Sequence, residues 1–228
     1  MRRSIFIVAI LIAGCQQKAA DPAANAAAPV SEVTAPRGFA ASPSFDCARA
    51  DGQAQELVCS DPALGAMDRE LSRLFALAEA DKMLPADGLA TLRANQRGWI
   101  KGRDDCWKAD ELRQCVMTSY AQRIHELRQG SKAARAEASE SLSIGPLAYF
   151  CDGIDAGIGV TFVKSDPGVL YMEWTDHSMA LNQVESASGA RYTGQWDGKP
   201  WQFWIKGREA TFSVPGTGDL ACREEEIG

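Results

Sequence analysis

The sequence predicts a two-domain α+β fold, an N-terminal disulfide-linked helical domain followed by a small antiparallel β-barrel or sandwich of seven or eight strands. Apolar residues recur at helical spacing between residues 60 and 127, whereas they alternate with polar residues between 170 and 214. Of seven cysteines, one lies in an N-terminal leader, so six remain, the even number that disulfide pairing requires. The 228 residues are 46% hydrophobic, which is enough for two modest cores.

Residues 1–15 have the features of a secretion signal. Two arginines precede the apolar run 5–12, which is too short to cross a bilayer as a helix of about 20 residues. The run ends in I-A-G-C, which resembles the lipobox of bacterial lipoproteins and implies lipidation of Cys15; ordinary signal cleavage beside an incidental cysteine is the alternative. Gln16 follows, and by resemblance to Gram-negative lipoproteins it favours anchoring to the outer membrane, in the periplasm.

Composition divides the rest of the chain. Residues 16–43 hold ten alanines and four prolines, which predicts a disordered tether. The helical domain is expected at 44–128, a polar linker at 129–145, whose early part could extend the preceding helix, and the β-domain at 146–228. The β-domain has twelve acidic and six basic residues, a net charge of −6. This charge argues against nucleic acid and favours a cationic partner, although a merely soluble surface explains it equally well.

Three apolar stripes predict amphipathic helices that pack on one another. Ser60-Asp61-Pro62 predicts a helix start, with a capping side chain and then proline in the first turn, while Pro85 and Gly88 interrupt the pattern. The stripes are Leu64, Met67, Leu71, Leu74, Phe75 and Ala78; Leu89, Leu92, Trp99 and Ile100; and Val116, Tyr120, Ile124 and Leu127.

In the second half the period changes to two, as expected of half-buried strands. Turn signals at 166–168, 197–198 and 215–216 separate the runs. The alternating apolar residues are Leu170, Met172 and Trp174; Trp201, Phe203 and Ile205; and Ala210, Phe212 and Val214.

Motifs for catalysis and metal binding are absent from the sequence. No C-x2-C pair occurs, and His125 and His177 lie in different halves, which argues against zinc. There is no G-x-S-x-G, no phosphate loop and no histidine-based triad. We therefore expect a protein that is not an enzyme and needs no cofactor.

Four motifs in the second half occur in a recognisable order. They are Y-F-C-D-G at 149–153, S-A-S-G-A-R-Y at 186–192, F-W-I-K-G at 203–207 with E-A following, and Cys222. Together they resemble the MliC family, the membrane-bound inhibitors of c-type lysozyme. The resemblance implies a barrel rather than a sandwich, and c-type lysozyme as the protein partner. The segment between Tyr192 and Phe203 is longer than usual for the family, so the reach of this hairpin is open.

The first half resembles a second family, the LprI-type lysozyme-inhibitor domain. The matching pieces are S-F-D-C at 44–47, V-C-S-D-P-A-L at 58–64, Asp68, Q-R-G-W at 96–99, Arg103-Asp104-Asp105-Cys106 and Cys115. Asp68, Gln96, Trp99 and Arg103 are expected to form a structural polar network between helices rather than a site.

The six cysteines are expected to pair locally in the first half and across the β-domain in the second. Four cysteines allow three connectivities, and the local one is favoured because each bond closes a short loop; a crossed arrangement remains open. The expected pairs are Cys47 with Cys59, Cys106 with Cys115, and, by the family resemblance, Cys151 with Cys222.

The candidate lysozyme-binding residues are Ser188, Gly189 and Lys206, with Arg191 and Tyr192. Gly189 permits a tight turn, Ser188 offers a hydroxyl, and Lys206 is a cation that alternation places outward. The MliC resemblance implies that Ser188 and Lys206 contact the catalytic carboxyls of lysozyme, whereas from the residues alone Ser188-Gly189 is only a hairpin turn. Arg191 and Tyr192 are expected to fix the loop from behind.

Two expectations stay open at this point. Trp196 and Trp201, in the longer segment, are expected at the rim of the site, with core burial equally favoured for Trp201. The alternative function is an envelope scaffolding lipoprotein that binds peptidoglycan or an endogenous lytic enzyme.

Overall fold

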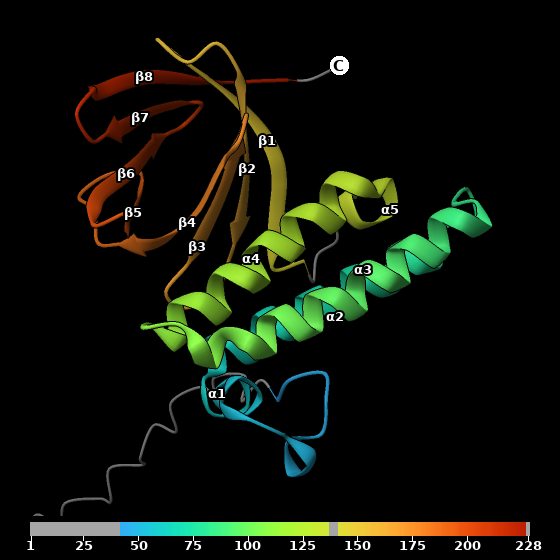
Figure 1. Cartoon of the computed structure of the whole chain (residues 1–228). Coiled ribbons are helices and arrows are strands. Elements are labelled where there is room, and N and C mark those ends of the chain that lie inside the picture. Colours follow the sequence, from blue (N-terminus) through green and yellow to red (C-terminus); the bar gives the residue numbers. More distant parts are fainter. Residues whose placement is uncertain (1–41, 137–140, 227–228) are drawn as a thin grey trace, which may run out of the picture. The chain divides into compact units, whose positions relative to one another are not determined.

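The structure is a computed structural model that describes residues 42–136 and 141–226. In these residues the helices come first along the chain and the strands follow (Figure 1). The signal, Cys15 and most of the expected tether lie outside these residues. The helical elements are η1 Cys47–Arg49, α1 Gln53–Ser60, α2 Pro62–Glu79, α3 Ala86–Asp104, η2 Asp105–Lys108, α4 Leu112–Gly130 and α5 Lys132–Arg135. Among the described helices, none has the length and apolarity needed to cross a membrane.

Helix α2 begins where the sequence predicts. The Asp61 side chain accepts hydrogen bonds from the backbone N–H groups of Ala63 and Leu64, and Pro62 occupies the first helical position. Arg113 of α4 donates its Nε–H to the same carboxylate at 2.7 Å. The cap of α2 therefore also ties this helix to α4.

The first and third predicted stripes form the core of the helical half, whereas the second packs only at its edge. Leu64, Leu74 and Ile124 are fully buried. In α3, by contrast, Arg103 is the only buried residue, and Ile100 is 39% exposed. The α3 stripe is therefore a peripheral contact, made chiefly with α4.

Helix α4 is buried on two sides, because it packs both on the other helices and on strands β1–β4 (Figure 1). His125 faces the strands: its Nδ1 lies 2.9 Å from the Thr161 hydroxyl and its ring centroid 5.1 Å from that of Tyr171. The outward side chains of Val163, Val169, Tyr171 and Ala180 belong to the same apolar cluster as the helices. The helices and the outer face of β2–β4 thus share one core, and the interior of the barrel forms a second, separate core.

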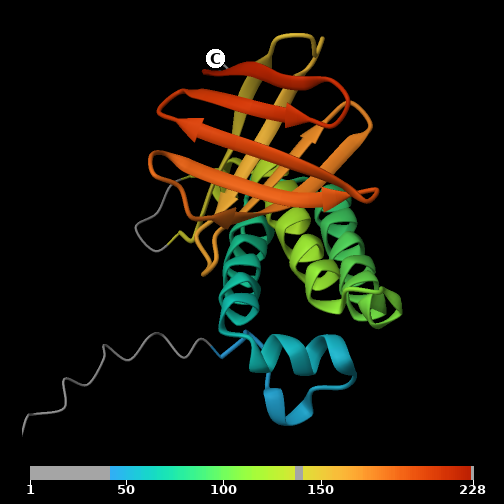
Figure 2. The ribbon, with the colours of Figure 1, turned by 90° about the vertical axis from the view of Figure 1, so that its left-hand side faces the viewer.

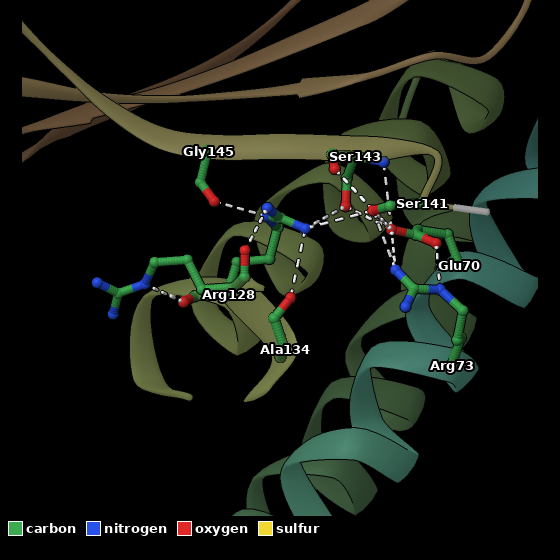
Figure 3. Close-up of polar contacts among 8 residues, drawn as sticks. Glu70, Arg73, Arg128, Ala134, Ser141, Ser143 and Gly145 are labelled. Atoms are coloured by element: carbon green, nitrogen blue, oxygen red, sulfur yellow. Dashed lines mark hydrogen bonds and ion pairs between the residues drawn. The ribbon is translucent and has the colours of Figure 1, made fainter. Parts of the chain in front are cut away.

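The early part of the stretch 129–145 is helical, as the extension of the preceding helix predicts, and its end already belongs to the barrel. The stretch contains the end of α4, all of α5 and the beginning of β1. Arg128 is 1% exposed, and its Nε–H donates to the Gly145 carbonyl at 2.6 Å (Figure 3). Arg128 also donates hydrogen bonds to the carbonyls of Ala134 and Arg135. The guanidinium therefore provides hydrogen-bond donors for backbone carbonyls where the chain turns from α4 into α5.

Glu70 of α2 joins this buried polar cluster (Figure 3). Its carboxylate accepts from the Ser143 backbone N–H at 3.2 Å and from the Ser141 hydroxyl at 3.1 Å, and Arg73 binds it through two N–H groups at 2.9 Å. Burial alone raises the pKa of the Glu70 carboxyl, but the bonds from Arg73 and Ser143 outweigh it and hold that pKa below its usual value. The start of β1 is therefore fixed to α2 by an ionised, hydrogen-bonded carboxylate.

The eight strands of the described residues form a closed antiparallel barrel in which each strand pairs with its neighbour and β1 pairs with β8. This closure removes unpaired strand edges. The strands are β1 Ser143–Cys151, β2 Gly157–Val163, β3 Val169–Trp174, β4 His177–Val184, β5 Ala190–Trp196, β6 Lys199–Lys206, β7 Glu209–Val214 and β8 Gly218–Glu225. Buried inside are Tyr149, Ile158, Val160, Leu170, Met172, Phe203 and Phe212. The outer face of β5–β8, red-orange in Figure 2, has no helix in front of it.

The disulfides follow the expected pairing, local in the helical half and across the barrel in the second. Cys47 is bonded to Cys59, Cys106 to Cys115, and Cys151 to Cys222. Cys151 and Cys222 are direct partners in the β1–β8 register, so their bond lies across the seam that closes the barrel.

Candidate functional site

The candidate site lies where the loop between β4 and β5 meets the end of β6. Ala190 pairs with Ile205 in the β5–β6 register, so Gly189 lies beside Lys206. The side chains of Ser188 and Lys206 are both exposed. The fold thus brings together, on the surface, two residues that are 18 positions apart in the sequence.

Gly189 makes this close approach possible. Its φ is +67°, in the left-handed region, and a Cβ at this position would collide with the Ile205 carbonyl oxygen and lie 3.0 Å from Lys206 Cγ. Both constraints exclude a larger residue without movement of the backbone. The tight turn that Gly189 permits is thus also a close contact between loop and strand.

Three hydrogen bonds fix the loop that carries Ser188. Arg191 Nη2 donates to the Glu185 carbonyl at 3.1 Å, at the start of the loop. At its end, the Ser188 carbonyl accepts from the Ser186 hydroxyl at 2.8 Å and from Trp204 Nε1–H at 2.9 Å. The backbone of Ser188 is therefore held in place, while its side chain faces solvent.

Lys206 extends over the same tryptophan. Its ammonium nitrogen lies 3.7 Å from the centroid of the Trp204 ring, a cation–π geometry. Alternation along β6 puts Trp204 and Lys206 on one face, since they are two residues apart. The sequence interpretation did not single out Trp204, although this spacing within F-W-I-K-G was visible.

Tyr192 supports the site from inside the barrel. It is 7% exposed, pairs with Phe203 in the β5–β6 register, and its ring centroid lies 5.7 Å from that of Phe162. Burial raises the pKa of its phenol. Tyr192 therefore stays neutral and packs into the barrel interior from β5, the strand that follows the loop.

Trp196 and Trp201 do not flank Ser188, contrary to the rim expectation. The longer segment extends the β5–β6 hairpin to a two-residue turn at Asp197-Gly198, both with positive φ. Trp196 lies six residues along β5 from Ala190, a distance of about 20 Å. The two tryptophans contact each other and form part of an aromatic cluster with Trp174 at the far end of the barrel, which fits the burial alternative for Trp201.

A groove of about 560 Å³ begins beside Lys206. It runs over the outer faces of β6, β7 and β8 and the end of β1 around Phe150, and its lining also includes Trp204, Glu209 and Arg223. Arg223 and Glu209 form an exposed ion pair at 3.3 Å. Within the described ranges, no cluster of His, Cys, Asp and Glu side chains is arranged to hold a metal ion.

The helical half contains part of the expected polar network: Asp68 and Arg103 are joined through Tyr120, whereas the Gln96 side chain accepts from Arg123 and the Trp99 indole N–H donates to the Ser119 carbonyl. The Asp68 carboxylate accepts from the Tyr120 hydroxyl at 2.8 Å, which in turn accepts from Arg103 Nη1 at 2.8 Å. The Arg103 guanidinium also lies between the rings of Phe45, Trp99 and Tyr120. These groups satisfy one another between helices, as a structural role requires.

Comparison with known families matches the two halves separately. Residues 149–221 match the family described as membrane-bound lysozyme-inhibitor of c-type lysozyme, MliC, and residues 47–127 match the family described as lysozyme inhibitor LprI. The chain combines an LprI domain with an MliC domain. Both are families of lysozyme inhibitors, which are not enzymes, and the MliC match contains every candidate binding residue.

The relatives extend the similarity across both domains. Lipoprotein LprI of Mycobacterium bovis and that of Mycobacterium tuberculosis are each 28% identical to the chain over 193 residues, which cover 84% of this chain and 85% of theirs. No solved structure shows significant similarity to the chain.

Proposed function

We propose that the protein is a lipid-anchored inhibitor of c-type lysozyme that inserts the Ser188 loop and Lys206 into the active-site cleft of the enzyme. The observation that carries this proposal is the adjacency of two exposed residues, Ser188 and Lys206, on a loop and a strand end fixed by Gly189 and Trp204. The MliC match at 149–221 supplies the class of partner.

The chemistry of the target suits this pair. Such lysozymes use two carboxyl groups, one kept protonated as the acid and one ionised. The Lys206 ammonium complements the ionised carboxylate, and the Ser188 hydroxyl can donate to or accept from the other. A charge-assisted hydrogen bond contributes about 1.5–3 kcal/mol once water is excluded. The groove beside Lys206 is a concave surface that can receive the edge of the active-site cleft of lysozyme.

Charge assists the encounter. Residues 146–228 carry a net charge of −6, whereas the lysozymes of this class are strongly basic. Opposite net charges raise the association rate, and this gain falls as salt screens the field. We therefore expect association to slow with ionic strength while dissociation changes little.

The anchor belongs to the same proposal. The lipobox at Cys15 and the lipoprotein relatives both support attachment of the chain to a membrane of the cell envelope. Placement in the periplasm, on a Gram-negative outer membrane, rests on Gln16, whereas these relatives are mycobacterial. Labelling with palmitate, compared between the parent and Cys15→Ser, tests the lipid, and membrane fractionation tests the location.

Substitution of the two contact residues tests the inhibition. Ser188→Ala and Lys206→Ala should each weaken inhibition of cell-wall lysis by c-type lysozyme, by about tenfold or more for Lys206. Lys199→Ala is the matched control, because Lys199 is also exposed and lies at the other end of β6. Inhibition by both site variants at the parental level, with unchanged thermal unfolding, would show that the assigned contacts are wrong. Binding of the parent to peptidoglycan sacculi but not to lysozyme would favour the scaffolding alternative.

A further inference from the structure

One side chain contacts both halves of the candidate site. Trp204 donates its indole N–H to the Ser188 carbonyl at 2.9 Å, and its ring lies 3.7 Å from the Lys206 ammonium. It is half-buried on the outer face of β6, where it also lines the groove. Its neighbours in the sheet are Arg191 on β5 and Thr211 on β7, so the position of its backbone is set by two strands.

We infer that Trp204 is the positioning residue of the inhibitory site, which sets the spacing between the Ser188 loop and the Lys206 ammonium before lysozyme binds. This inference rests on the proposed function. Trp204 acts through its two neighbours: the indole N–H fixes the loop, and the ring face limits the directions that the Lys206 side chain can take.

The physical reason is preorganisation. A lysine side chain has four methylene groups and many rotamers, and binding must select one of them. A lysine side chain whose cation is held over an indole ring already occupies a restricted set of rotamers. Less conformational entropy is therefore lost when the complex forms. The same argument applies to the Ser188 loop, whose end is held by two donors, Trp204 and Ser186.

Two substitutions separate the two contacts of Trp204. Trp204→Phe keeps an aromatic face for Lys206 but removes the donor to Ser188, and we expect inhibition to weaken roughly three- to tenfold. Trp204→Leu removes both contacts and should cost a further factor of roughly two to five. Trp196→Phe is the control, since Trp196 is 44% exposed at the far end of the same hairpin, and it should leave inhibition within about twofold of the parent.

A role in barrel stability alone is distinguished by a double-mutant cycle in the whole chain. In a Lys206→Ala background, Trp204→Leu should weaken inhibition by a smaller factor than in the parent, because one of its two partners is already gone. Equal factors in both backgrounds would mean that Trp204 does not act through Lys206. Nuclear magnetic resonance of the free protein gives a second measurement: the Lys206 methylene protons should be shifted upfield by the ring, and Trp204→Leu should abolish this shift.

The outcomes separate this inference from the proposed function. If Lys206→Ala inhibits poorly while Trp204→Leu inhibits like the parent, the positioning role is refuted and the proposed contacts stand. If Lys206→Ala inhibits like the parent, the contact assignment itself fails and the role of Trp204 fails with it.

Discussion

His125 predicts a specific loss of stability in mild acid. It is fully buried between α4 and the barrel, where its Nε2 has no hydrogen-bond partner among the described residues. Burial lowers the pKa of His125 to about 4, and the nearby Glu126 opposes this only in part. Protonation would place a charge between the helices and strands β2 and β3, next to Thr161 and Tyr171.

The sign and size of the effect follow from linkage. In the unfolded chain the histidine has its usual pKa of about 6.5, so above that pH it is neutral in both states and stability is fully present. As the pH falls from 6.5 towards 4, the unfolded state binds a proton that the native state excludes, and stability is lost. The difference between the two pKa values corresponds to a maximum of about 3 kcal/mol, of which about 2 kcal/mol is lost by pH 5.

Urea unfolding at pH 7, 6 and 5 measures this loss. Acidic groups also titrate towards the lower end of this range, so the informative quantity is the difference between the parent and His125→Gln, which does not titrate there. Glutamine keeps a polar group within reach of Thr161. Between pH 7 and 5, the free energy of unfolding of the parent should fall by about 2 kcal/mol more than that of the variant. Parallel decreases would refute burial of a neutral His125 as the cause.

Four further predictions concern the fold and the loop. Replacing Cys151 and Cys222 by serine should lower the free energy of unfolding by about 4 kcal/mol, since the bond closes a separation of 71 residues; an unchanged thermal midpoint would contradict this. Glu70→Ala should cost about 3–5 kcal/mol in urea unfolding, because Arg73 and the Ser143 N–H lose their partner, and a cost below ~1 kcal/mol would show that the cluster is not stabilising. Gly189→Ala should cost about 1–3 kcal/mol and weaken inhibition of lysozyme, whereas parental inhibition would mean that the tight approach is not needed. Residues 146–228 alone should bind a hydrophobic dye and unfold below the parent, because the outer face covered by α4 becomes exposed; a cooperative transition at the parental midpoint would contradict this.

Much of the barrel could be predicted from the sequence because its physical signal is local. Alternation along a strand reports directly which side chains face the interior, as at Phe203, which is buried, and Lys206, which is exposed. Asp197-Gly198 marks a turn through its own backbone preferences. In the helical half, short loops favoured the two local cysteine pairs, whereas the pair Cys151–Cys222, 71 residues apart, was implied only by the resemblance to MliC proteins. Apart from this last pair, these features depend on neighbours in sequence or on composition alone.

The union of the two domains could not be predicted in this way. A helix with one apolar stripe is expected to have one buried face, yet α4 also buries His125 and Arg128 against the barrel. Polar composition at 129–145 indicates a linker, but the structure satisfies these polar groups with partners such as Glu70, which is 73 positions from Ser143. Burial of a polar residue depends on such distant partners, and a single sequence does not reveal them.

The residues of the candidate site, like the fold, were predictable only in part. Gly189 and Lys206 were identifiable as a turn residue and an outward cation, and the resemblance to MliC proteins singled out Ser188. Trp204 was missed because its spacing from Lys206 places both residues on one strand face but does not reveal what the indole contacts. Trp204 matters because its indole N–H donates to the carbonyl of Ser188, 16 positions earlier in the sequence. Only the register of β5 and β6 brings these two residues together.

Strand β4 connects the LprI domain to the Ser188 loop. The outer side of β4 packs on α4 through Ala180, and Asn182 donates to Gln114 of α4 at 3.2 Å. The same strand ends at Val184, one residue before the loop that begins at Glu185. The helices therefore contact the strand that carries the Ser188 loop while leaving the outer face of β5–β8 open to a partner. Because a packed strand resists displacement, contact with α4 should limit movement at the base of the loop, so the helical domain can support inhibition without touching lysozyme.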